Sequence, residues 1–200
     1  GQGKYKKQTG GHGQYGDVWL RLEPASEYGF EWRITGGVIP SKYQEAIEEG
    51  IKEAAKKGVL AGFPVMGFKA IVYNGSYHEV DSSDLAFQIA ASLAFKKVMA
   101  EAHPVLLEPI YRLKVLVPQE RVGDVLSDLQ ARRGRILGME QEGALSVVHA
   151  EVPLAEVLEY YKALPGLTGG AGAYTLEFSH YAEVPPHLAQ HGSFSSFLAT

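Results

Sequence analysis

Near the start of the chain, the stretch GGHGQYGDV at residues 10–18 has residue types and spacing that could bind a nucleotide. It contains G-x-G-x-x-G-x-V, in which glycines let backbone N–H groups approach phosphate oxygens. A dinucleotide site needs a buried strand before the pattern and a helix opening at its third glycine. Here polar residues precede it, and DVWLRLEP after it alternates apolar and polar side chains, which predicts a strand.

Strands on both sides of the stretch would suit the glycine-rich loop of a protein kinase. The sequence, however, has neither an HRD-type catalytic loop nor a DFG motif. We therefore interpret the stretch as a glycine-rich hairpin without a nucleotide. Its glycines would permit positive φ angles or close backbone approach.

Other catalytic or metal-binding patterns are missing from the sequence. None of the seven histidines forms H-x-x-x-H or H-E-x-x-H, and there is no G-x-S-x-G elbow. YHEVD offers His78, Glu79 and Asp81, but strand alternation would send neighbours to opposite faces. The chain has no cysteine, which excludes disulfides and thiolate metal sites. We expect no catalytic residue, no metal and no cofactor in this chain.

Composition indicates a soluble, cytoplasmic protein. Two hundred residues with 46 % apolar content can build one or two cores. No apolar run is long enough to span a membrane, and no signal-peptide pattern opens the chain. The net charge of −4 argues against a simple polybasic nucleic-acid binder, so any RNA contact must be local.

The first half predicts three strands, a helix, a strand and a second helix. Ser41 is the expected N-cap of the first helix, and Gly58 its end. The second helix begins at DSSD, residues 81–84, and is expected to be buried because it is apolar over most of its circumference. The prolines of AHPVLLEP place a domain boundary there, giving domains 1–103 and 104–200.

The second half predicts the order β-α-β-β-α-β, the ferredoxin-like split βαβ unit. Its second helix is expected to bury Leu154, Val157, Leu158 and Tyr161, and the tail at 187–200 is expected to fray. Such a sheet can be an RNA-recognition platform, but GAGAYTLEF lacks the basic residue typical of that family. From these patterns alone, the chain is a two-domain binding module without an active site.

Several segments follow one another in the order and spacing of one protein family: KQTGGHGQYGDV, GFEWRITGGVIPSKY, GSYHEVDSS, ARRGRILGM and LEFSHYAEVP. The chain resembles the C-terminal half of elongation factor G from about Lys4 to Val184. The resemblance implies an α+β fold: an elongated ribosomal-protein-S5-domain-2-like α/β sandwich (domain IV, 1–103), then a ferredoxin-like domain V (104–200). The family's GTPase domain is not in this sequence, so we expect a fragment.

In this family the tip of domain IV enters the decoding centre of the small ribosomal subunit and touches the tRNA–mRNA duplex. The resemblance places two loops at the tip, Gly10–Gly16 and Asn74–Asp81. The implied contact residues are Gly11, His12, Gly13, Gln14, Tyr15, Gly16, Ser76, Tyr77, His78, Glu79 and Asp81. Without the resemblance, His78 would be interpreted as an exposed turn residue.

The stretch QARRGR carries Arg132, Arg133 and Arg135 at the end of a predicted helix. Cations there stabilise the negative end of the helix dipole. The resemblance implies a further role, contact with ribosomal RNA at the large-subunit factor-binding centre, because arginine forks suit phosphates.

Three positions depart from the family's usual residues. Two lie at the tip: His12 stands where arginine is usual, and Asp17 where histidine is frequent. The third is TGGAG at 168–172, where the family usually has TQGRG. Together these departures suggest a paralogue with weakened phosphate contacts.

The resemblance therefore implies the ribosome-contacting part of a translocation factor that is a monomer and makes no membrane contact. Its partners would be the ribosome and the absent N-terminal domains, where GTP and magnesium would bind and a ribosome-stimulated GTPase would act. Two alternatives stay open: a ribosomal protection protein, and a stand-alone RNA-binding module.

Overall fold

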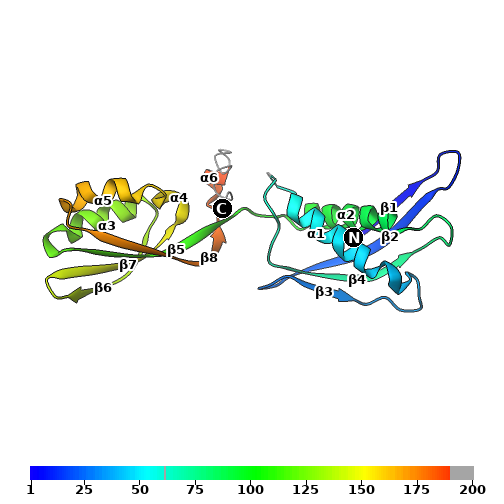
Figure 1. Cartoon of the computed structure of the whole chain (residues 1–200), viewed down its shortest axis with the longest axis horizontal. Coiled ribbons are helices and arrows are strands. Elements are labelled where there is room, and N and C mark those ends of the chain that lie inside the picture. The colour runs from blue at the N-terminus through cyan, green and yellow to red at the C-terminus, as the bar shows by residue number, and fades with distance from the viewer. Residues whose placement is uncertain (61, 190–200) are drawn as a thin grey trace. The chain divides into compact units, whose positions relative to one another are not determined.

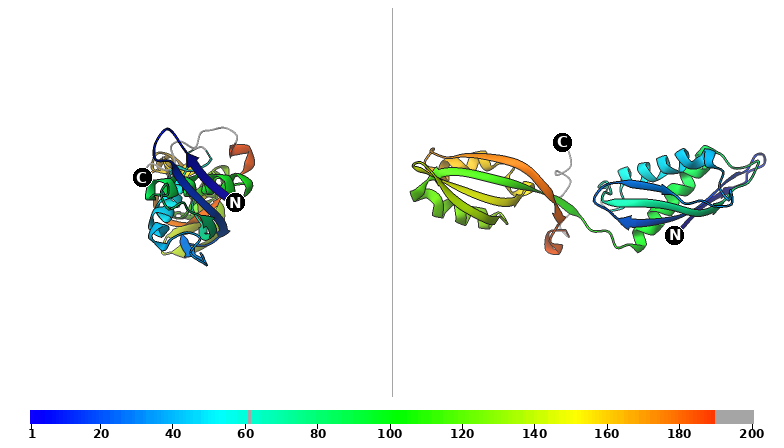
Figure 2. Two further views of the ribbon diagram at one scale, coloured as in Figure 1. Left: turned by 90° about the vertical axis from the view of Figure 1, so that its right-hand side faces the viewer. Right: turned by 90° about the horizontal axis from the view of Figure 1, so that it is seen from below.

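The computed structural model describes residues 1–60 and 62–189, which form two compact units (Figures 1 and 2). The first unit is Gly1–Pro104, and the second begins at Val105. Each unit combines one four-stranded sheet with helices, so the fold class is α+β, as predicted.

The first unit has its two long helices on one face of its sheet (Figure 1). The sheet order is β1-β2-β4-β3, with β3 parallel to β4 and the other pairs antiparallel. Its elements are β1 (Gln2–Lys7), β2 (Gln14–Pro24), β3 (Gly29–Trp32), a 3₁₀ turn (Ser41–Tyr43), α1 (Gln44–Lys57), β4 (Phe68–Ser76) and α2 (Asp84–Glu101).

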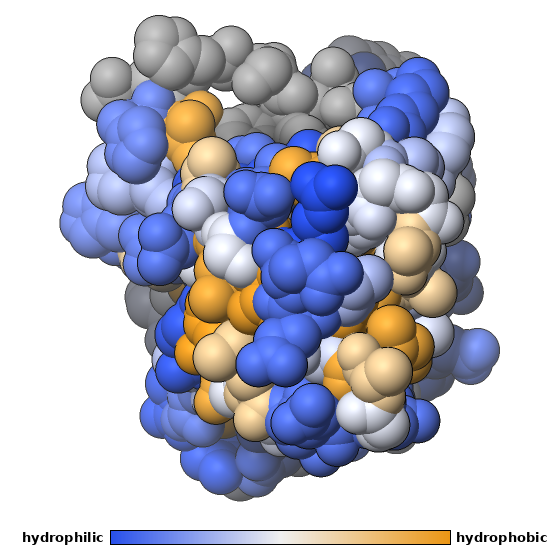
Figure 3. Space-filling view, turned by 90° about the vertical axis from the view of Figure 1, so that its left-hand side faces the viewer, coloured by the Kyte–Doolittle hydropathy of each residue, from blue (hydrophilic) through white to orange (hydrophobic). Residues whose placement is uncertain are grey.

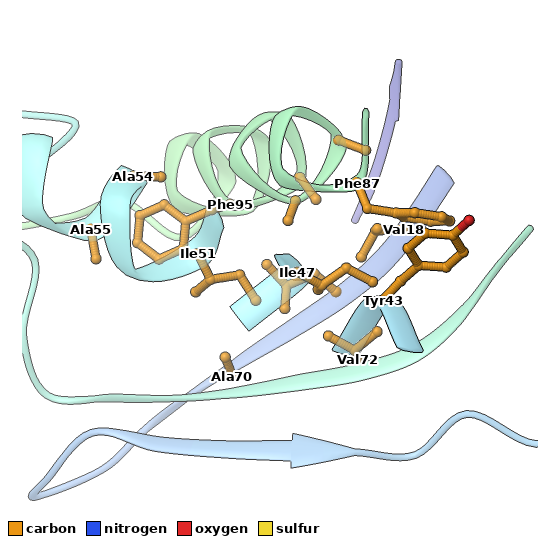
Figure 4. Close-up of a cluster of buried hydrophobic side chains, with 14 of the residues drawn as sticks. Val18, Tyr43, Ile47, Ile51, Ala54, Ala55, Ala70, Val72, Phe87 and Phe95 are labelled. Carbon is orange, nitrogen blue, oxygen red and sulfur yellow. The ribbon is translucent and has the colours of Figure 1, made fainter. Parts of the chain in front are cut away.

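The core of this unit lies between the helices and the sheet (Figure 4). Ile47 and Ile51 of α1 are fully buried with Val72 of β4 and Phe87 of α2. The rings of Tyr43 and Phe87 lie together, with 4.6 Å between their centroids. The helices are also close to each other, because a Cβ added to Gly50 of α1 would lie 2.5 Å from the carbonyl oxygen of Gln88.

Two details of the helices differ from the predictions. Ser41 makes no side-chain cap; it begins the 3₁₀ turn, which follows Pro40 and replaces the expected first turn of α1. Helix α2 is capped by Ser83 as predicted, with the Ser83 side chain accepting from the Ala86 N–H at 3.1 Å. It is not buried all round, since Leu85 and Leu93 are 56 % and 41 % exposed, while Ala86, Ala90 and Ala94 are buried against the sheet.

The second unit has the strand order β6-β7-β5-β8 with every pair antiparallel, which is the predicted ferredoxin-like topology. Helices α3 and α5 cover one face of the sheet (Figures 1 and 2). The elements are β5 (Leu107–Pro118), a 3₁₀ turn (Gln119–Arg121), α3 (Val122–Ala131), β6 (Arg135–Glu142), β7 (Leu145–Pro153), α4 (Leu154–Val157), α5 (Tyr160–Thr168), β8 (Ala173–Glu183) and α6 (Pro186–Ala189).

The predicted second helix of this unit is two helices, α4 and α5. The break changes the helical phase, so Tyr160 is buried and the predicted core residues Leu158 and Tyr161 are exposed. On the face shown in Figure 3, hydrophilic and hydrophobic side chains are interspersed. Residues 187–189 of the tail belong to α6, and the expected fraying of 190–200 falls outside the described residues.

Gly50→Ala tests the close contact between α1 and α2. Alanine is normally better than glycine inside a helix by ~1 kcal/mol. Here the new methyl group would overpack the contact with Gln88, at a typical cost of about 1–3 kcal/mol. We expect the free energy of unfolding of the first unit to fall by as much as about 2 kcal/mol in urea titrations, the balance of these two effects.

Both tryptophans, Trp19 and Trp32, lie in the first unit, so their fluorescence reports its unfolding alone. The exposed Glu53→Ala on the same helix is the control. Equal stability of the two variants would contradict the packing argument.

Candidate functional site

The two predicted tip loops lie side by side at one end of the first unit (Figures 1 and 2). The N–H of Tyr15 donates to the carbonyl oxygen of Asp81 at 3.0 Å. The Ser82 hydroxyl donates back to the Tyr15 carbonyl oxygen at 2.8 Å. A Cβ on Gly13 would lie 2.8 Å from Asp81 Oδ2 and 3.2 Å from the Lys7 carbonyl oxygen, so a side chain there would crowd the β4–α2 loop. The β1–β2 turn and the β4–α2 loop therefore form one surface.

The secondary structure divides the predicted site residues into turn and strand. Gly11, His12 and Gly13 lie in the β1–β2 turn, whereas Gln14, Tyr15 and Gly16 are the first residues of β2. Ser76 ends β4, and Tyr77, His78, Glu79 and Asp81 follow in the β4–α2 loop. Gly16 is buried, and a Cβ there would lie 2.6 Å from the Ala86 carbonyl oxygen. This third glycine of the motif therefore serves helix–sheet packing.

The imidazole of His78 is held within its own loop. Its Nδ1 accepts from the N–H groups of Val80 and Asp81, each at 3.2 Å. An accepting Nδ1 carries no proton, so the neutral ring keeps its proton on Nε2. The side chain is 56 % exposed and thus presents an N–H donor to the surroundings.

Strand alternation was predicted to keep His78, Glu79 and Asp81 from binding a metal together, and this reason is wrong. Residues 78–81 are in a turn, so strand alternation does not separate them, and His78 Nδ1 lies 3.7 Å from Asp81 Oδ2. Within the described residues, no group of three or more His, Cys, Asp or Glu could hold a metal ion.

Asp17 is not an exposed anion of the tip, contrary to the expectation from its place in the sequence. It is only 6 % exposed, and its carboxylate accepts from Gln2 Nε2 and Ser76 Oγ, both at 2.7 Å. Because Ser76 gives its proton to Asp17, its oxygen accepts from the Tyr15 hydroxyl at 2.6 Å. This network joins β1, β2 and β4 beside the loops.

Sequence reasoning missed a third segment at this end, Ile34–Pro40 between β3 and the 3₁₀ turn. Ile39 is buried against Gly75, where a Cβ would lie 2.4 Å from Ile39 Cδ1. Just after the segment, the Tyr43 hydroxyl donates to the Ser82 carbonyl oxygen at 3.3 Å. The adjacent glycines of TGGVIP, both with positive φ, were the signal that could have identified it.

The predicted arginines of the second unit differ in how far they are engaged. Arg132 donates to Asp128 at 2.8 Å and to the Glu156 carbonyl oxygen at 2.6 Å, and lies over the Tyr160 ring. The Arg133 fork holds both oxygens of Glu108, at 2.7 and 3.0 Å.

Arg135 is the most exposed of the three. Its side chain is 73 % exposed, although it contacts Glu151 at 2.6 Å. The others are 24 % and 26 % exposed, which fits a structural role for Arg132 and Arg133.

Glu108 explains why Arg133 is needed. Its carboxylate is almost fully buried, and a buried charge is tolerated only with a partner and hydrogen bonds. Arg133 supplies both, and its hydrogen bond to Glu108 raises the pKa of the guanidinium. To reach this geometry, Arg133 adopts a φ of 58°, a conformation that is uncommon without glycine.

No described helix is both long and apolar enough to cross a membrane.

Comparison with known proteins relates both units to one family. The family model described as "Elongation factor G, domain IV" matches residues 1–103, and "Elongation factor G C-terminus" matches residues 105–191. Elongation factor G of Aquifex pyrophilus is 52 % identical over 193 residues, which are 95 % of this chain and 28 % of that protein. A crystal structure from Thermus thermophilus is 99 % identical with a TM-score of 0.89, over 95 % of this chain and 29 % of that one. The chain thus spans less than a third of the length of these relatives.

The ion pair of Arg133 with Glu108 gives a stability prediction for the second unit. Arg133→Ala should lower the free energy of unfolding by about 3–5 kcal/mol, because it leaves a buried carboxylate without its partner. Arg135→Ala removes an exposed pair and should cost at most ~1 kcal/mol. Urea unfolding followed by far-UV circular dichroism measures both variants. Adding Glu108→Ala to Arg133→Ala should restore part of the loss, and a double variant no better than the single one would contradict the pairing.

Proposed function

The chain belongs to the elongation factor G family, and from this premise we propose that it is the ribosome-contacting C-terminal part of a translational GTPase. In this proposal the full-length protein promotes movement of tRNA and mRNA through the ribosome. GTP and magnesium bind in its N-terminal domains, outside this chain, and the protein acts as a cytoplasmic monomer. The observation that carries the proposal is the single surface formed by the β1–β2 turn and the β4–α2 loop.

This surface has the properties needed to contact an RNA duplex closely. Gly10 and Gly11 have no neighbouring atom closer than 4.0 Å to the place a Cβ would occupy, so their backbone is open to phosphate and ribose groups. His78 adds an outward Nε2–H donor. The hydrogen bonds between the two loops hold these groups in place before binding, which lowers the entropy cost of contact. We assign the surface to the tRNA–mRNA duplex at the decoding centre.

In the second unit we assign contact with the large-subunit factor-binding centre to Arg135. Its guanidinium is exposed, so it can exchange its contact with Glu151 for a phosphate at little cost. Arg132 and Arg133 would have to give up several internal hydrogen bonds to do the same. Their role is to hold the α3–β6 turn that presents Arg135.

Gly13→Val and His78→Ala, made in the full-length protein, should slow single-round tRNA movement while ribosome-stimulated GTP hydrolysis is retained. Valine at position 13 would push Asp81 away and separate the loops, and alanine at 78 removes the Nε2–H donor. Gly123→Ala in α3 of the second unit is the control, because its methyl group would meet no atom within 4 Å and the residue lies outside both loops. Parallel loss of hydrolysis and movement would argue against a role confined to the tip.

Arg135→Ala should weaken ribosome binding and reduce the slope of log affinity against log salt by about 1, the effect of one lost phosphate contact. Its melting temperature should stay near that of the wild type because the side chain is exposed. Arg121→Ala, another exposed arginine of the same unit, serves as the control. An Arg135→Ala variant that binds ribosomes with unchanged affinity and slope would remove this assignment.

A further inference from the structure

The sheet face of the first unit that α1 and α2 leave uncovered contains free lysines near the loop end. Cross-strand partners in an antiparallel pair share a face. Gly3 pairs with Val18 on the face that meets α2, so Lys4 and Lys6, which alternate with it, lie on the uncovered face. Their partners Asp17 and Tyr15 lie there too.

The half of this face far from the loops has its charges neutralised. Arg21 pairs with Glu23 at 3.2 Å, and Glu31 pairs with Arg33 and, at 2.8 Å, with Lys69. The hydrogen bonds from Arg33 and Lys69 lower the pKa of Glu31 to about 2. These five side chains are therefore occupied with one another rather than available to a partner.

The half near the loops has unpaired positive charge. Lys4 and Lys6 are exposed, and within the described residues neither forms an ion pair. Asp17, directly opposite Lys4, is buried and occupied by Gln2 and Ser76. Although the whole chain carries a net charge of −4, this surface attracts anions.

Aromatic rings lie beside these lysines on the same face. Trp19 of β2 and Tyr73 of β4 meet edge to face, 6.4 Å between centroids, and Tyr73 is 39 % exposed. Tyr15 lies under Lys4, whose Nζ is 5.5 Å from the ring centroid. Free cations next to exposed rings are what single-stranded nucleic acids require, because phosphates need the charge and unpaired bases stack on the rings.

We propose that this surface, formed by Lys4, Lys6, Tyr15, Trp19 and Tyr73, binds a single strand of RNA. The lysines hold successive phosphates along β1, and the Trp19–Tyr73 pair stacks an unpaired base. The surface shares Tyr15 with the predicted tip contacts, but the proposal goes beyond the tip loops because neither His78 nor the glycine turn takes part. It adds to the duplex contact a second RNA contact on the side of the same unit.

The test is fluorescence anisotropy of a labelled oligouridylate of about 12 nucleotides, within the site sizes of single-strand binders, with the intact chain at low salt. Lys4→Ala with Lys6→Ala should weaken binding at least about fivefold and flatten the salt slope by roughly 1.4, from ~0.7 per phosphate on a single strand. Tyr73→Ala should weaken binding about tenfold through lost stacking. Lys96→Ala with Lys97→Ala, the same change of charge on exposed residues of α2, should stay within about twofold of the wild type.

Absence of binding by the wild type, or equal weakening by both lysine pairs, would overturn the proposal. So would a poly-glutamate peptide of equal charge that binds as tightly as the RNA. His78→Ala separates the two RNA contacts: oligouridylate binding should be unchanged, and a loss confined to that variant would overturn the sheet-face assignment. The translocation assay of the tip variants tests only the proposed contact of the loops with the tRNA–mRNA duplex. The tip proposal and the sheet-face proposal can therefore fail independently.

Discussion

Close backbone packing between α2 and the β1–β2 hairpin is the contact on which the loop surface depends. Gly16 lets β2 approach Ala86 in the first turn of α2, and Gly3 of β1 lies against Ala90 and Ala94 one and two turns later. Residues 77–82 lead directly into that first turn. Bringing the start of α2 onto the sheet therefore brings the β4–α2 loop beside the β1–β2 turn, where hydrogen bonds join them. Any side chain at position 16 would push both loops apart.

Apart from the Tyr160 hydroxyl, the buried polar side chains of the described residues have hydrogen-bond partners, and a few charged side chains extend outward from each unit. At the loop end, Asp17 accepts hydrogen bonds from Gln2 and Ser76, and among the described residues no ion pair engages the neighbouring Lys4 and Lys6. In the second unit, Arg133 neutralises the buried Glu108, and Arg135 extends outward. Since the chain as a whole is acidic, the proposed RNA contacts depend on such local arrangements.

Sequence patterns predicted the element order of both units, because periodicity and capping are local properties. Ser83 as the cap of α2 and Gly58 as the end of α1 are examples. Contacts between distant residues were not predictable: Asp17 meets Ser76 across 59 positions, and Arg133 meets Glu108 across 25. The same limit explains two errors. Asp17 is a charged residue expected at the surface, but its pairing with Ser76 in the sheet buries it. Leu158 was expected in the core of one continuous helix, but the break between α4 and α5 turns it outward.

The packing of Gly16 on α2 holds the two loops together. Amide hydrogen exchange at Tyr15, whose N–H donates to Asp81, measures this directly. The account predicts that Gly16→Ala removes the protection of the Tyr15 amide while the core amides of β4 stay protected, and that Gly11→Ala leaves Tyr15 as protected as in the wild type. Equal protection of Tyr15 in Gly16→Ala and in the wild type would contradict it.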